Sequence, residues 1–169
     1  MAAIVEIDEQ NGKSDSPLLT HNISHTNMGS ADAVNLDPLI CPVSPGGNTC
    51  EKWQLFHVTN MGTSSRVRDL RIWRSGNLND GAVHMTNATP KSYLGAPVYT
   101  TPSASISQVA KNIMPTSTPT QANLGINGSL NGNLVSPGYS DFFVHQIQTT
   151  PKAIAGNTST LNYQYDEVA

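Results

Sequence analysis

The segment that most constrains the fold is the strand-like run at residues 160–168. Its apolar side chains, Leu161, Tyr163 and Tyr165, occupy every second position, with polar residues between them. This period of two is typical of a β-strand that buries one face. A second β-rich run, residues 141–149, precedes it across a loop that contains Pro, Gly and Asn. The pattern therefore predicts that a pair of strands near the C-terminus closes a sheet.

The composition also favours an all-β domain. Charged residues make up only 12% of the 169-residue chain, and 13 Gly and 11 Pro provide many turns. One domain of this length buries about 70% of the surface of its unfolded chain. The net charge of −3 argues against a general nucleic-acid binder. There is no apolar run of the roughly 20 residues that a membrane span needs, and the N-terminus lacks the features of a secretion signal.

The order of patterns predicts an N-terminal arm followed by a single sandwich domain. Residues 1–20 are the arm, because a short strand candidate is followed by the polar sequence EQNGKSDS. Residues 21–169 are the domain, with a long, loop-rich insertion around residues 76–137. Further strands are expected at residues 18–26, 36–43, 51–59 and 67–74. Within the insertion we expect one short helix at residues 103–114 and an extended surface loop at residues 115–133.

Two of the strand candidates differ in their faces. In residues 51–59, apolar side chains occur on both faces, which predicts a central strand covered on both sides. In residues 67–74, Leu70 and Ile72 lie on one face, while Asp69, Arg71 and Trp73 lie on the other.

Two segments resemble known modules. The sequence FHVTNMGTSSRVRDLRIW, within residues 51–74, resembles an early hairpin of Ig-like sandwich modules. Residues 136–168 resemble the final hairpin of such modules. In particular, the ending is similar to small β-sandwich virion proteins of tailed bacteriophages, which close on an aromatic strand followed by Tyr-Asp-Glu, here at residues 165–167.

The resemblance implies an Ig-like β-sandwich of about seven to nine strands, with a jelly roll as the alternative topology. It implies a structural virion protein, most simply a capsid decoration or cement protein. The expected partners are the major capsid protein, other virion proteins and further copies of the chain in a homo-oligomer. Such a protein is assembled in the host cytoplasm and resides in the virion. The alternative is a carbohydrate- or host-surface-binding module that uses Trp53, Trp73, Tyr93, Tyr99 and Tyr139 as a platform.

The arginines are concentrated in one short segment. Arg66, Arg68, Arg71 and Arg74, together with Trp73, lie within nine residues. Arg and Trp are favoured at protein interfaces, so this segment is a candidate partner-binding surface. The alternative is a solvated strand whose arginines pair within the chain, for example with Asp69, and contact with nucleic acid is a third reading.

Cys41 and Cys50 flank the sequence PVSPGGNT, whose Pro-Gly-Gly centre can turn back on itself. A disulfide across this loop is sterically possible, and a pair of free thiols is the alternative. A metal site there would need two further ligands, for which His57 is only a nominal candidate.

No motif predicts an enzyme. The sequence has no GxSxG, HExxH, phosphate-binding or dinucleotide-binding motif. The sequence NLNDG at residues 77–81 resembles a calcium loop but lacks the later Glu ligand, so it is interpreted as a turn. His57 and His145 fall within strands and are interpreted as structural. We therefore expect no catalytic residues, no metal and no cofactor.

Overall fold

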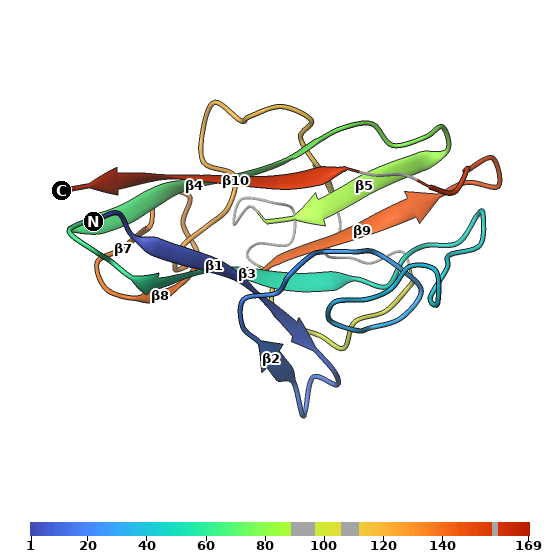
Figure 1. Cartoon of the computed structure of the whole chain (residues 1–169), viewed down its shortest axis with the longest axis horizontal. Helices are drawn as coiled ribbons and strands as arrows, with labels where there is room; N and C mark the ends of the chain where they lie inside the picture. The colour runs from blue at the N-terminus through green and yellow to red at the C-terminus, as the bar shows by residue number, and fades with distance from the viewer. Residues whose placement is uncertain (89–96, 106–111, 157–158) are drawn as a thin grey trace.

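The chain folds into two antiparallel sheets (Figure 1). The computed structural model describes residues 1–88, 97–105, 112–156 and 159–169, and these contain no helix. The larger sheet has the order β2 (Leu18–Thr20), β1 (Ile4–Asn11), β3 (Lys52–Asn60), β9 (Phe143–Thr149), β5 (Ala82–Asn87) and β6 (Asn112–Ile113), with β8 (Gly138–Tyr139) pairing beside β9 on β3. The smaller sheet is β10 (Thr160–Val168), β4 (Arg66–Ser75) and β7 (Asn133–Leu134). The predicted all-β sandwich is confirmed.

The core lies between the two sheets, and both contribute to it. Phe56, Val58 and Phe143 come from the larger sheet, and Leu70 and Ile72 from the smaller one; all five are at most 2% exposed. Leu161, Tyr163 and Tyr165 pack against this cluster, as their alternation predicted. Removing this apolar surface from water is the main term that holds the two sheets together.

Strand β3 is central, as predicted from its two apolar faces. Trp53 and Leu55 are buried on one face, and Phe56 and Val58 on the other. β1 pairs along one edge of β3, while β8 and β9 pair along the other.

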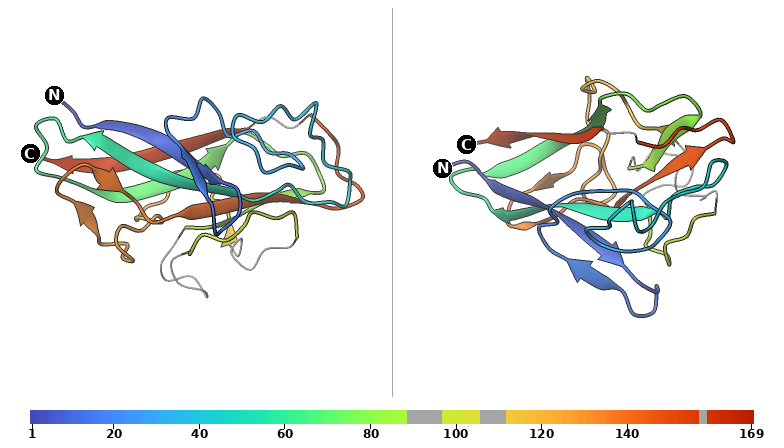
Figure 2. Two further views of the ribbon diagram at one scale, coloured as in Figure 1. Left: turned by 90° about the horizontal axis from the view of Figure 1, so that it is seen from below. Right: turned by 45° about the vertical axis from the view of Figure 1, so that its right-hand side comes forward.

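The two predicted hairpins are wrong. β3 and β4 lie in different sheets, and so do β9 and β10. β10 instead pairs with β4, from Thr160 opposite Ser75 to Val168 opposite Arg66. Both connections cross from one sheet to the other (Figure 2), because the apolar faces of consecutive strands are turned toward each other across the core. Gly62 allows the first crossing: its φ is +58°, and an added Cβ would lie 2.1 Å from the Met1 carbonyl oxygen.

The N-terminal segment differs from the predicted arm. β1 pairs with β3 of the same chain, from Ile4 opposite Asn60 to Gln10 opposite Trp53. Thr63 N–H also donates to the Met1 carbonyl. In this structure the segment is therefore part of the larger sheet, and the two termini lie at the same end of the molecule (Figures 1 and 2).

The insertion completes the sandwich. Met114, Leu124 and Ile126 are at most 1% exposed and belong to the core, so residues 115–133 are not simply the predicted surface loop. Asn123 lies beside β4 and pairs with the Ile72 backbone: its amide donates to the Ile72 carbonyl, and its oxygen accepts from the Ile72 N–H.

Two other predicted elements differ. Residues 36–43 form turns rather than a strand, and Leu39 and Ile40 are exposed. The predicted helix falls largely on residues 106–111, which lie outside the described residues, and β6 follows directly after them.

Candidate functional site

The structure divides the arginine cluster between two environments. Arg66 and Arg68 are exposed, whereas Arg74 is only 8% exposed and turned inward with Leu70 and Ile72. Arg71 lies on the outer face, where one Nη is 3.7 Å from an Asp166 carboxylate oxygen. The partly buried Trp73 shares that outer face by alternation. The outer surface of the smaller sheet thus keeps four of the five residues predicted for partner binding.

A bulge in β4 explains this division. Val67 and Leu70 are both buried although they are three positions apart, and Asp69 between them has a φ of +54°. The register of β10 against β4 shifts at the same level, between Gln164 and Asp166. One extra residue in a strand reverses which side chains face the core beyond it.

β10 forms an open edge of the smaller sheet. Among the described residues it pairs only with β4. Its nine residues, TLNYQYDEV, include no Pro, Gly or Lys. By contrast, the edge strands of the larger sheet, β2 and β6, have three and two residues. The two charged residues of β10, Asp166 and Glu167, lie near its C-terminal end. The rest of this long edge leaves a row of backbone donors and acceptors free to pair.

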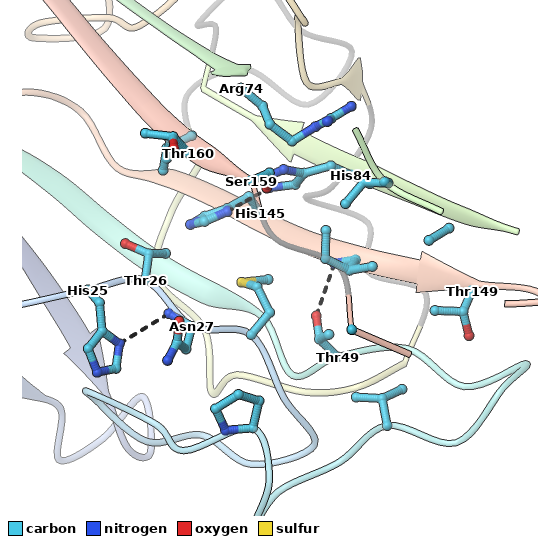
Figure 3. A pocket seen from close by; sticks show the side chains of 18 of the residues that line it. His25, Thr26, Asn27, Thr49, Arg74, His84, His145, Thr149, Ser159 and Thr160 are labelled. Atoms are coloured by element: carbon cyan, nitrogen blue, oxygen red, sulfur yellow. Dashed lines mark hydrogen bonds between the residues drawn. The ribbon is translucent and has the colours of Figure 1, made fainter. Parts of the chain in front are cut away.

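A cavity of about 790 Å³ (Figure 3) lies toward the end of the sandwich that is opposite the two termini (Figure 1). Its walls come from β4, β5, β9 and β10 and from loops around residues 23–28, 38–45 and 153–156. Apolar side chains such as Ile147 and Leu161 supply much of the lining. Among the described residues that line it there is no carboxylate, and Arg74 is the one with a formal charge.

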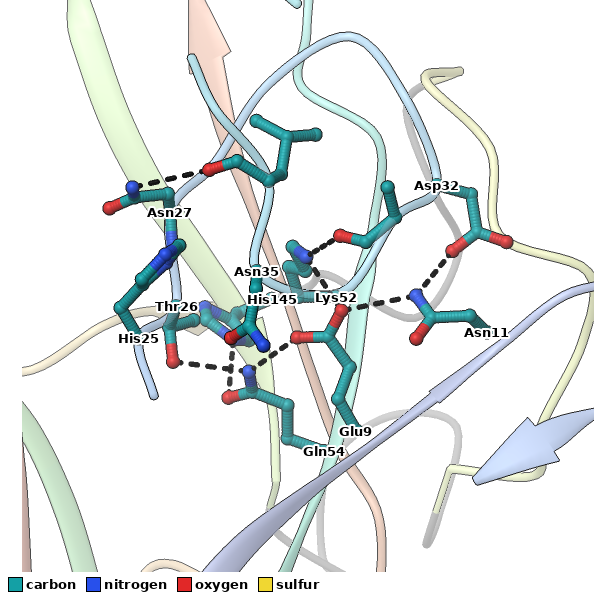
Figure 4. A network of polar contacts seen from close by, with 12 residues as sticks. Glu9, Asn11, His25, Thr26, Asn27, Asp32, Asn35, Lys52, Gln54 and His145 are labelled. Carbon is teal, nitrogen blue, oxygen red and sulfur yellow. Dashed lines mark hydrogen bonds and ion pairs between the residues drawn. The ribbon is translucent and has the colours of Figure 1, made fainter. Parts of the chain in front are cut away.

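A network of buried polar side chains runs from Lys52 to His145 (Figure 4) and on to His84, and both histidines line the cavity (Figure 3). Lys52 Nζ donates to Glu9 Oε1 at 2.6 Å, and Gln54 Nε2 donates to Glu9 Oε2 at 2.9 Å. Because the amide nitrogen of Gln54 is the donor there, its oxygen accepts from His145 Nε2 at 3.1 Å. His145 Nδ1 then accepts from His84 Nε2 at 2.8 Å.

Because His84 donates through Nε2, its neutral ring keeps Nδ1 as an acceptor. It has no hydrogen-bond partner among the described residues, and the same holds for Arg74 Nε and the Tyr163 hydroxyl. Burial, helped by the nearby Arg74, lowers the pKa of His84 to about 4. His84 is therefore neutral at pH 7. His84 and Arg74 both line the cavity, and each has one buried nitrogen without a hydrogen-bond partner among the described residues.

A second cluster lies on the outer side of the larger sheet. Glu6, Asp8, His21 and His57 each offer one ligand atom, and these four atoms lie within 4.8 Å of one another. The nearest contacts are His21 Nδ1 to Asp8 Oδ2 at 2.6 Å, and His57 Nδ1 to Asp8 Oδ2 and to Glu6 Oε1, both at 3.0 Å. The His57 ring stacks on Tyr139 with 4.1 Å between centroids.

Sequence reasoning missed this cluster because it depends on register. Glu6 and Asp8 are two positions apart, which is a visible signal that they share a face of β1. That His57 lies opposite Glu6 follows only from the pairing of β1 with β3.

The two cysteines form no disulfide, and Trp53 is not accessible to the ligand of the expected aromatic platform. Cys41 and Cys50 are free thiols, and burial, with smaller effects of Asp32 and Glu51, raises the pKa of Cys50 to about 11. Trp53 is fully buried, in edge contact with Tyr99. Tyr93 of the expected platform lies outside the described residues.

Comparison of the chain with protein-family profiles, with curated proteins and with solved structures found no match. No helix in the described parts of the chain is long and apolar enough to cross a membrane.

Proposed function

We propose that this chain is a structural virion protein of a tailed phage, of the capsid decoration or cement type. It acts through protein–protein contacts with the major capsid protein, or with other virion proteins and further copies of itself, and it catalyses no reaction. The observation that carries the proposal is the open β10 edge. The resemblance of the C-terminal residues to small phage β-sandwich proteins supplies the virion context.

The edge provides a means of assembly. An incoming strand can pair with β10 through main-chain hydrogen bonds, and the adjoining side-chain pockets then select the partner. Arg71 and Trp73 lie on the outer face of β4, next to that edge, and are residue types enriched at interface hot spots. Repetition of a modest contact over a symmetric shell gives avidity without any single tight site.

The test combines capsid binding with hydrogen exchange. The purified chain is sedimented with capsids of the phage that encodes it, and amide exchange of β10 is compared in free and bound states. Roughly every second β10 amide faces away from β4 in an antiparallel pair and exchanges quickly when free. We expect those alternate amides to become protected on binding.

Arg71→Glu provides the side-chain variant, and Lys152→Glu, at an exposed position in the loop between β9 and β10, provides the control. Arg71→Glu should weaken sedimentation with capsids while the circular dichroism spectrum persists, and the control should bind normally. Absence of the chain from purified particles by mass spectrometry, or unchanged exchange of β10 in the bound state, would contradict the proposal.

The cavity favours a second candidate function, the binding of a small amphipathic molecule. Ligand pockets commonly have volumes of about 300–1,000 Å³, with mostly apolar walls and a few convergent polar groups. Arg74 and His84 both line the cavity, and each has a buried nitrogen, a donor on Arg74 and an acceptor on His84, without a partner among the described residues. This pair suits a group that both accepts and donates, such as a hydroxyl, attached to an apolar body.

A fluorescent long-chain alcohol is a direct probe of this candidate. Arg74→Met and His84→Phe should each weaken its binding by about tenfold, which corresponds to about 1.4 kcal/mol, the size of a hydrogen bond. Arg68→Met, which changes an exposed residue of the same strand, is the matched control. Equal binding by all three variants would exclude the cavity as the site.

A further inference from the structure

We propose that Glu6, Asp8, His21 and His57 form a binding site for a divalent transition-metal ion of the zinc class. The proposal is independent of the virion function and of the cavity. It rests on four potential ligand atoms that converge within 4.8 Å of one another.

The backbone sets this convergence. Glu6 and Asp8 share one face of β1 because they are two positions apart. His57 is directly opposite Glu6 on β3, where the ladder fixes the spacing of the two side chains. His21 comes from the residues that follow β2, and the neighbouring Asn22 N–H donates to Asp8 Oδ1 at 3.0 Å, which ties this turn to the cluster.

The distances suit one ion. With the zinc bond lengths of about 2.0–2.1 Å, two ligands of a tetrahedral site lie about 3.3 Å apart. The ion-pair distances within the cluster run from 2.6 Å, for His21 with Asp8, to 3.8 Å, for His21 with Glu6. Both imidazoles direct Nδ1 at the same oxygen of Asp8, so three potential ligand atoms already converge.

The charge of the cluster favours a cation. Asp8 has a fully buried side chain, and that of Glu6 is only 19% exposed. Among the described residues, neither carboxylate forms an ion pair with Lys or Arg; both pair only with the two histidines. A covered pair of carboxylates without a permanent counter-charge is costly, and a divalent ion would neutralise it.

The donor types select the metal class. Two imidazole nitrogens with two carboxylate oxygens suit Zn²⁺, Co²⁺ or Ni²⁺, whereas Ca²⁺ and Mg²⁺ prefer oxygen ligands alone. The 55% exposed side chain of His21 leaves a path from solvent. The stacking of Tyr139 holds the ring of His57 in place.

The experiment uses the full chain and metal salts alone. Isothermal titration with Zn²⁺ after treatment with a chelator should give one site. With Co²⁺, visible d–d absorption bands of four-coordinate intensity should appear. His21→Gln and His57→Gln should each weaken Zn²⁺ binding at least about tenfold. The matched control is His25→Gln, an exposed histidine outside the cluster, which should bind as the wild type does.

Each result decides the proposal. Loss of binding in both cluster variants, with wild-type circular dichroism and intact binding by the control, supports it. No Zn²⁺ or Co²⁺ binding by the wild-type chain overturns it, and so does equal binding by the cluster variants and the control. If the cluster variants fail to fold, the wild-type Co²⁺ spectrum still decides, because a site with oxygen ligands from water alone gives only weak octahedral bands.

Discussion

At the scale of single residues, the unusual feature is a buried polar chain within a small core. Its interior links are each hydrogen-bonded, from Lys52 through Glu9 and Gln54 to His145 and His84. Each link fixes the donor or acceptor role of the next, so the chain specifies the relative positions of β1, β3, β9 and β5. Only its cavity end, at His84 Nδ1, remains unpaired among the described residues.

The two histidines of this buried polar network predict that the folded protein loses stability in weak acid. Burial lowers the pKa of His84 to about 4 and that of His145 well below its usual value of 6.5. The unfolded state therefore binds more protons than the folded state below pH 6.5, and stability falls as the pH falls. For His84 alone the loss between pH 6.5 and pH 4 is about 3 kcal/mol.

Urea unfolding at a series of pH values between 6.5 and 5 measures this effect, above the range where most carboxylates titrate. His84→Gln keeps a donor for His145 and should show a smaller dependence of the unfolding free energy on pH than the wild type. A free energy that stays flat over this range in the wild type would mean that the histidines are accessible to protons in the folded state.

At the scale of elements, periodicity identified strands but not their partners. The period-two patterns located β3, β4 and β10 to within a residue or two of their observed bounds. They missed β5 because its pattern is inverted: His84 and Thr86 are buried, while Val83 is exposed. Pairing depends on contacts that are distant in sequence, so neither the crossings between sheets nor the Glu6–His57 register was predictable from local pattern.

The observed register of β10 makes a specific prediction. Tyr163 packs against the core cluster, with its ring 5.8 Å from that of Phe143, whereas Gln164 is exposed. Tyr163→Ala should therefore cost about 3–5 kcal/mol of unfolding free energy, as deletion of a buried aromatic does. Gln164→Ala should change it by roughly 0.5 kcal/mol or less. Chemical denaturation of the two variants gives both values, and similar losses would refute the assigned faces.

At the scale of the whole molecule, the role of the first strand decides how the domain is built. β1 lies between β2 and β3 in the larger sheet, and its Glu9 is the buried partner of Lys52, whose side chain is only 2% exposed. Removal of an N-terminal arm would leave the stability of the rest of the domain unchanged. The position of β1 inside the sheet leads to the opposite expectation. Removal of Glu9 leaves a buried ammonium group without its carboxylate.

Deletion of residues 2–12 should therefore abolish cooperative unfolding. The point variant Glu9→Ala should cost about 3–5 kcal/mol, the usual effect of breaking a buried ion pair by removing one partner. Lys13→Ala, at an exposed position just beyond β1, is the matched control and should unfold like the wild type. Differential scanning calorimetry on the three variants distinguishes a β1 that stabilises its own domain from a β1 that pairs with a neighbouring subunit. A deletion variant that melts like the wild type but no longer assembles would show that β1 serves a neighbouring subunit, because only a strand supplied in exchange can be lost without cost to the domain that carries it.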